Sequence, residues 1–255
     1  MFASQRHEKI RQILIEKKNV DTSTLTSLLG VSDVTVRKDL AALEKEGFLR
    51  KTFGGAVLSE HDSSTHDYQK ASIDNVEIKD AIAEKASVQI QKGDTIFIGS
   101  GATCYLLAKK IRHRQDLTIV TNNVNALNEL IPYNSKIFFI GGELVHHEGM
   151  VSTSSERVED YFKGIYVNKA FTSVTGVDLT AGLTVNHIIS TYIYKKIQAM
   201  SFTWTLMVED TKFNKRGIHQ VATLNSPASI ISNYIPAEYL SYFEENHIET
   251  TLSTE

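Results

Sequence analysis

Residues 31–47, VSDVTVRKDLAALEKEG, have the pattern of a short amphipathic helix that begins after Ser32 and ends at Gly47. A serine at this position caps the free N–H groups of a first helical turn, and glycine ends helices because it tolerates a positive φ. The apolar positions repeat at near-helical spacing and define a buried face: Val36, Leu40 and Leu43.

Two further helices are predicted upstream, one from Ser4 to about Lys18 and a short one whose buried face consists of Leu25, Leu28 and Leu29. Asp21 and Thr22 can cap the second of these, and Gly30 can end it. One residue separates Gly30 from Ser32, so the second and third helices form a helix-turn-helix.

Residues 48–58, FLRKTFGGAVL, predict a β-hairpin directly after the third helix. Residues 48–53 form one strand, Gly54 and Gly55 the turn, and residues 56–58 the return strand. A hairpin at this place is a wing.

The exposed side of the third helix has the residues that a DNA recognition helix needs. Arg37 can contact guanine edges or a phosphate, and Lys38 a phosphate, while the hydroxyls of Ser32 and Thr35 can bond the DNA backbone. The alternative is an ordinary solvated basic surface. With the wing included, the predicted DNA-binding residues are Ser32, Thr35, Arg37, Lys38, Lys51, Thr52, Gly54 and Gly55.

The charge distribution agrees with a nucleic-acid-binding head. Residues 1–58 have 10 Lys and Arg against 7 acids, whereas the rest of the chain has a net charge of −6. Such asymmetry favours a polyanion partner, although a difference of this size is also found on ordinary surfaces.

The sequence therefore predicts a winged helix-turn-helix at 1–58, a polar linker at 59–75 and a larger, mostly parallel α/β domain at 76–255. In this last part short apolar strands alternate with amphipathic segments. The strands are predicted at 95–98, 117–120, 136–140, 169–174, 204–208, 219–222 and 229–231, and the helices at 77–91, 105–111, 124–130, 156–162 and 187–201.

Several classes of protein are disfavoured. No apolar run approaches the ~18 residues of a membrane span, and the first residues lack a secretion signal. Cys104 is the single cysteine, which excludes an intrachain disulfide and favours the cytoplasm. His146 and His147 lack the spaced third ligand of a zinc site, so no metal and no cofactor are expected.

A glycine-rich turn, GSGAT at 99–103, follows the strand at 95–98 and opens a helix. Free N–H groups and the helix dipole favour an anion there, although such turns are often purely structural. Other segments follow strands at the same sheet edge, where open α/β sheets bind ligands. The candidate effector-binding residues from these segments are Gly99, Ser100, Gly101, Ala102, Thr103, Thr121, Asn122, Gly141, Gly142 and Lys212.

The N-terminal part resembles the DeoR-type transcriptional regulators. The matching residues are Arg6, His7, Ile10, Val31, Ser32, Thr35 to Leu40, Leu43, Glu44, Gly47 and Gly54 to Ala56. The family usually has Arg-Arg where Arg37 and Lys38 stand, and a His where this chain has Phe53.

The second domain also resembles this family over most of its length. The resemblance implies a sugar-phosphate sensor with the fold of ribose-5-phosphate isomerase and the CoA transferases, with Lys212 contacting phosphate and Lys195 as a further effector-binding residue. Three acids of the family are replaced, by Gly99, Thr191 and Ile193. Their loss argues for a less hydroxylated effector and against isomerase catalysis, which needs a general base. Asp178 and Asp210 remain at strand ends, where we expect capping or ion-pair roles.

We therefore expect a sequence-specific regulator, more specifically a repressor of a carbohydrate operon, that binds double-stranded operator DNA as a homodimer or homotetramer and responds to a phosphorylated sugar. The alternatives are an isomerase-like enzyme and a DNA-binding regulator whose second domain is a ligand-free scaffold.

Overall fold

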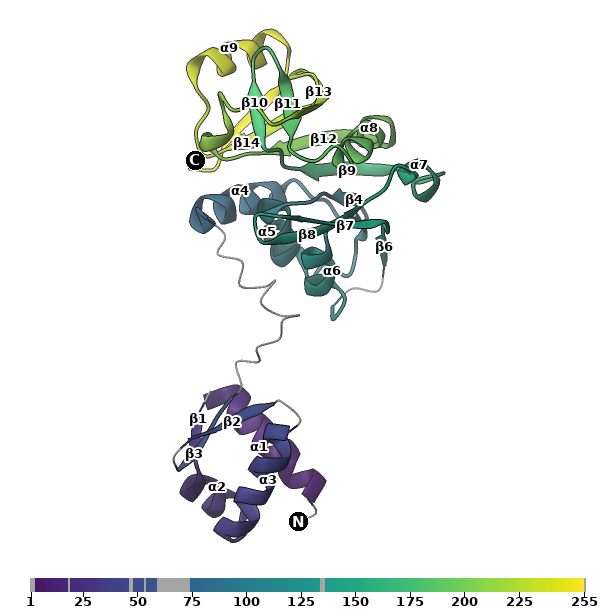
Figure 1. Ribbon diagram of the computed structural model, residues 1–255. Helices are drawn as coiled ribbons and strands as arrows, with labels where there is room; N and C mark the ends of the chain where they lie inside the picture. Colours follow the sequence, from purple (N-terminus) through teal and green to yellow (C-terminus); the bar gives the residue numbers. More distant parts are fainter. Residues whose placement is uncertain are drawn as a thin grey trace. The chain divides into compact units, whose positions relative to one another are not determined.

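The computed structural model describes residues 3–17, 19–45, 48–52, 54–58, 74–133 and 136–254. The chain divides into two compact units, Met1–Lys70 and Ala71–Glu255; their helices and strands run from purple to dark blue in the first unit and from blue through green to yellow in the second (Figure 1). Residues 59–73 of the predicted linker lie outside the described residues, as do Gly47 and Phe53. The boundaries 1–58, 59–75 and 76–255 therefore remain a prediction.

The first unit is a winged helix-turn-helix. Its elements are α1 (Ala3–Lys17), β1 (Asn19–Asp21), α2 (Thr22–Leu29), α3 (Asp33–Lys45), β2 (Leu49–Thr52) and β3 (Gly55–Leu58). The Asp21 carboxylate accepts the Thr24 N–H at 2.7 Å and caps α2. Gly30, at φ +65°, ends α2 as predicted.

The described strands of this unit form an antiparallel sheet in the order β1-β3-β2. Sequence analysis missed β1, because it is three residues long and buries a single side chain, Val20. One hydrophobic core joins the helices to the sheet; its members are Ile10, Leu14, Val20, Leu25, Leu29, Val36, Leu40, Leu43, Leu49 and Ala56.

The second unit is built on a parallel sheet of seven described strands in the order β15-β14-β12-β9-β4-β5-β6. These strands are β4 (Thr95–Ile98), β5 (Thr118–Thr121), β6 (Ile137–Phe139), β9 (Val167–Thr172), β12 (Ser201–Met207), β14 (Ser229–Ser232) and β15 (Glu249–Leu252). The chain proceeds outward from β4 in one direction and from β9 in the other, so the topological switch point lies between these two strands. The predicted mostly parallel α/β class is confirmed.

Helices cover both faces of this sheet (Figure 1). On one face lie α4 (Val76–Val88), α5 (Ala102–Ile111) and α6 (Val124–Leu130), whose apolar side chains share a core with Ile96 and Ile98 of β4. A second core includes Phe97 of β4 and lies under α7 (Val158–Tyr161), α8 (Ser190–Met200) and α9 (Ala237–Glu245). The side chains of β4 thus alternate between the two cores.

Two smaller sheets complete the second unit. The hairpin of β7 (Glu143–His147) and β8 (Met150–Ser154) and the strands β10 (Gly176–Asp178) and β11 (Gly182–Val185) were missed by sequence analysis, as were α9 and β15. β13 (His219–Ala222) pairs with β11, and a 3-10 turn, η2 (Asp210–Lys212), follows β12. Among the described residues, no helix is both long and apolar enough to cross a membrane.

Candidate functional site

Helix α3 has a buried apolar face and, on the opposite side, an exposed polar face. Val36, Leu40 and Leu43 are at most 2% exposed, whereas Arg37 and Lys38 on the other side are exposed. At its start, the Ser32 hydroxyl and carbonyl both accept from the Thr35 N–H, at 3.4 and 2.9 Å. The predicted recognition residues thus lie in the first turns of a capped helix, the arrangement of a DNA-reading helix.

The Arg37 guanidinium is already oriented by a neighbour. Its Nε donates to the Asp33 carboxylate at 2.6 Å, one helical turn earlier, and both side chains are more than half exposed. This pair holds the guanidinium at the surface of the first two turns of α3.

A buried carboxylate fixes α3 against α1. Asp39, whose side chain is 6% exposed, accepts from Arg6 Nε at 2.6 Å, from Arg6 Nη2 at 3.0 Å, and lies 3.0 Å from His7 Nε2. Burial opposes ionisation of Asp39, but the hydrogen bonds from Arg6 and His7 outweigh it and lower the pKa of this carboxyl. These residues matched the family pattern in the sequence, yet the contact between them had no sequence signal.

The wing contains the other predicted DNA-binding residues. The Lys51 N–H donates to Glu44 at 2.8 Å, which connects β2 to α3, and Thr52 pairs with Gly55 across the hairpin. Gly54 has φ +103°. A Cβ on Gly55 would lie 2.3 Å from the Val20 carbonyl oxygen, so only glycine fits beside β1.

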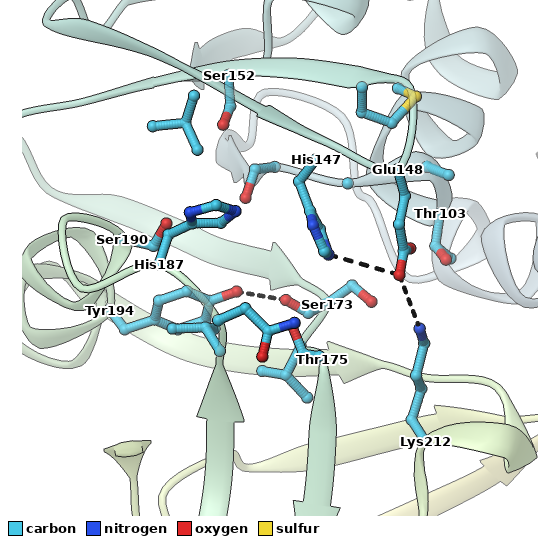
Figure 2. Close-up of a pocket in the computed structure, with 18 of the residues that line it drawn as sticks. Thr103, His147, Glu148, Ser152, Ser173, Thr175, His187, Ser190, Tyr194 and Lys212 are labelled. Carbon is cyan, nitrogen blue, oxygen red and sulfur yellow. Dashed lines mark hydrogen bonds and ion pairs between the residues drawn. The ribbon is translucent and has the colours of Figure 1, made fainter. Parts of the chain in front are cut away.

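A pocket in the second unit lies at the carboxyl ends of β4 and β9, the switch point of the sheet (Figure 2). The glycine-rich turn provides one wall, with Ser100, Gly101, Ala102 and Thr103 among the lining residues. Gly101 precedes α5 at φ +97° and gives it no side-chain cap. Because glycine has no side chain, the N-cap residue cannot cap the first N–H groups of α5.

Another part of the pocket has lysines held by one buried carboxylate. Lys212 Nζ lies 3.8 Å from Glu209 and 3.9 Å from the exposed Glu148, and Lys79 Nζ lies 3.4 Å from Glu209. Glu209 also accepts from the Asn75 side chain at 3.0 Å. Lys79 is 8% exposed although it stands on a helix, and its burial was not foreseen because a lysine in an amphipathic segment is usually solvated.

The remaining wall consists of imidazoles, hydroxyls and aliphatic side chains. His147 and His187 meet ring edge to ring face with centroids 5.5 Å apart, and His147 Nε2 lies 3.5 Å from Glu148 (Figure 2). The Tyr194 hydroxyl donates to the Ser173 carbonyl. The other lining residues of this part are Val145, Met150, Ser152, Val174, Thr175, Val185, Asn186 and Ser190. Sequence analysis did not assign this wall to the site.

Other predicted effector residues do not line this pocket, and their role in binding stays a prediction. Gly99 is buried beneath it, and its N–H donates to Phe171 at 2.9 Å. Thr121 donates to the Ile98 carbonyl, and Asn122 donates to the Thr153 carbonyl. Lys195 is exposed on α8.

The glycine pair before β7 and the positions of the replaced family acids make contacts within the fold. Gly141 and Gly142 precede β7, and a Cβ on Gly142 would lie 2.3 Å from the Ser154 carbonyl oxygen. At the positions of the family acids, Thr191 Oγ1 donates to the Ile188 carbonyl and Ile193 is buried.

The two strand-end aspartates engage neighbouring groups. Asp178 pairs with Arg216 at 2.8 Å and accepts from two backbone N–H groups, of Thr180 and Ala181. Asp210 accepts from the Asn233 amide. Among the described residues, no group of three His, Cys, Asp or Glu side chains could hold a metal ion.

Comparison with known proteins gives concordant results for both units. The sequence model of the DeoR-like helix-turn-helix domain matches residues 6–62, and that of the DeoR C terminal sensor domain matches residues 74–234. The lactose phosphotransferase system repressor of Staphylococcus aureus (strain NCTC 8325 / PS 47) is 31% identical over 243 residues, which are 92% of this chain and 93% of that protein. A putative aga operon transcriptional repressor of Escherichia coli O157:H7 is 27% identical over 255 residues, 98% of this chain and 93% of that protein.

Among solved structures, ribose 5-phosphate isomerase a from Methanocaldococcus jannaschii is 16% identical and aligns over 55% of each chain with a TM-score of 0.40. The assignment rests instead on the two sequence models, which together extend over most of the chain, and on relatives that match it along nearly their whole length. The chain belongs to the DeoR family of helix-turn-helix transcriptional regulators.

Proposed function

We propose that this chain is a cytoplasmic repressor of an operon for carbohydrate metabolism, and that a phosphorylated sugar bound in the pocket of its second unit changes its affinity for operator DNA. The first unit would bind one half-site with α3 in the major groove and the wing beside it. Because operators of such proteins mirror two-fold symmetry, the chain would act as a homodimer or homotetramer.

The observation that supports DNA binding most directly is the exposed polar face of α3. Arg37 and Lys38 extend from a helix whose opposite side is buried and whose attachment to α1 is fixed through Asp39. A rigid base is needed for side chains that must reach base edges in a fixed register. The relatives named as repressors of sugar systems support the regulatory role.

The pocket supports effector binding at the carboxyl edge of the sheet. The start of α5 and the ammonium groups of Lys79 and Lys212 favour an anionic group. An effector that binds one conformation of the chain more tightly than another shifts the DNA affinity by that difference in binding free energy. Of the described residues that line the pocket, Glu148 is the one carboxylate, which favours a binding site over an isomerase centre.

The decisive experiment is selection of binding sites from random duplex DNA with the purified full-length chain at a stated salt concentration, because phosphate contacts make affinity salt-dependent. A recovered two-fold motif would support the proposal. Recovery of no motif would refute sequence-specific binding and leave Arg37 and Lys38 as a solvated surface.

The selected operator then serves to find the effector. A gel-shift titration with a panel of sugar phosphates should reveal a compound that changes operator affinity, and the same compound should not be turned over. Lys212→Ala should keep operator binding and lose the response. A full response in that variant would show that the phosphate site lies elsewhere.

A further inference from the structure

The charges of the pocket cancel before any ligand enters. Among the described residues, the ammonium groups of Lys79 and Lys212 are balanced by the carboxylates of Glu209 and Glu148, which lie 3.4 to 3.9 Å from them. Glu209 is 4% exposed and contacts both lysines, so it cannot readily leave. A ligand with two negative charges would therefore enter a site whose positive charge is already neutralised.

His147 and His187 are the imidazole side chains among the described residues that line this pocket, and imidazole is the side-chain type whose charge most commonly changes near neutral pH. The two rings are in contact, and His147 stands between His187 and the Glu148 carboxylate that reaches Lys212 (Figure 2). The other titratable groups around the pair are Lys79 from α4 and the Tyr194 hydroxyl from α8, which is already donated to a carbonyl.

We propose that His147 and His187 bind the dianionic phosphoryl group of the effector together with Lys212, and that one proton enters the pocket with it. The proposal rests on the proposed function, because it assumes that the anion site lies in this pocket. It adds two binding residues, a ligand charge of −2 and a dependence of affinity on pH.

The direction of the dependence follows from the surroundings of His147. Burial lowers the pKa of this imidazole, the Glu148 carboxylate opposes the shift, and His187 and Lys212 add to it. Without ligand the ring is therefore neutral at pH 7. A dianion placed beside it favours the imidazolium, so ligand affinity falls as the pH rises, by up to about tenfold per pH unit for one linked proton.

The test uses sulfate as the probe, because it keeps two negative charges across the neutral pH range, whereas phosphate esters titrate there. Binding to the full-length chain is measured as a saturable rise in the unfolding temperature followed by the fluorescence of Trp204, the single tryptophan. Sulfate stays in the low millimolar range at ionic strength held constant with NaCl, which limits its general stabilising effect. Lys212→Ala reports whatever stabilisation does not come from the pocket.

We expect at least tenfold weaker sulfate binding at pH 8 than at pH 6. His147→Gln should abolish most of this dependence and His187→Gln should reduce it. His146→Gln, on the exposed side of the same strand, should keep it. Addition of sulfate to the unmodified chain in weakly buffered solution at pH 7 should also raise the pH, which tests proton uptake without any variant.

The outcomes separate this inference from the function on which it rests. Saturable binding that needs Lys212 but shows neither pH dependence nor proton uptake would overturn the role of the histidines and leave the anion site standing. Equal stabilisation of the unmodified chain and Lys212→Ala, or none in either, would overturn the anion site and this inference with it, while operator selection would still test DNA binding.

Discussion

Replacement of Asp39 by Ala should destabilise the first unit far more than the second. Asp39 is 6% exposed in its side chain and joins α3 to α1 through Arg6 and His7. Removing one partner of a buried ion pair costs about 3–5 kcal/mol because the other charge stays desolvated. Arg6 and His7 keep 13% and 22% exposure and can gain water, so we expect the lower end, about 3 kcal/mol.

The matched control is Asp33→Ala on the same helix. Asp33 also pairs with an arginine at 2.6 Å, but both of these side chains are more than half exposed. Exposed pairs of this kind contribute at most about 1 kcal/mol. Asp33→Ala should therefore cost at most about a third as much as Asp39→Ala.

The two units can be followed separately during urea unfolding. Trp204 is the single tryptophan and lies in the second unit, so its fluorescence reports on that unit alone, whereas far-ultraviolet circular dichroism reports on both. In Asp39→Ala the circular dichroism transition of the first unit should move to lower urea concentration while the fluorescence transition stays unchanged. Equal effects of the two substitutions would refute the conclusion that the buried network fixes α3.

Three more results follow from the structure. Arg37→Ala should weaken operator binding by ~1–3 kcal/mol and relax specificity at one base pair, whereas Lys38→Ala should weaken all sequences alike; gel shifts with operator and random duplex distinguish these effects. Glu148→Gln should tighten sulfate binding at pH 8 by up to about fivefold, the equivalent of ~1 kcal/mol for an exposed ion pair, in the same fluorescence assay. Hydrogen bonds from Arg216 and backbone N–H groups lower the pKa of Asp178 to about 2. Its contribution to stability is therefore complete above about pH 4 and is lost as the pH falls toward 2; Asp178→Asn should unfold with less acid dependence in that range, and an unchanged acid titration would contradict this.

The parts of the fold that the sequence predicted have strong local patterns. Helix α3 was located correctly because its apolar residues recur about every 3.6 positions, and β4 because its apolar residues are consecutive. In the sequence, a glycine follows the end of each element. The hairpin of β7 and β8 was missed because only a few of its side chains are apolar and buried, and because the first residue of its Glu148-Gly149 turn adopts φ +48° without being Gly, Asn or Asp.

Sequence analysis named some of the residues that line the pocket and missed the others. The wall after β4 has a recognisable glycine-rich sequence, and Lys212 follows a predicted strand at the expected edge. His147, His187 and Lys79 come from a hairpin, a loop and a helix face whose approach to this edge depends on tertiary packing, which periodicity does not encode.

The connection between Asn75 and Glu209 has a consequence for how this chain reaches its native state. These residues are 134 positions apart, and Glu209 also contacts Lys79 and Lys212, which line the pocket. Contacts between such distant segments form late in folding, because a long loop must be closed first. A nascent or truncated chain that ends before Glu209 therefore has no complete cavity for a metabolite. A ligand of that pocket would therefore stabilise only chains that have been completed past this point.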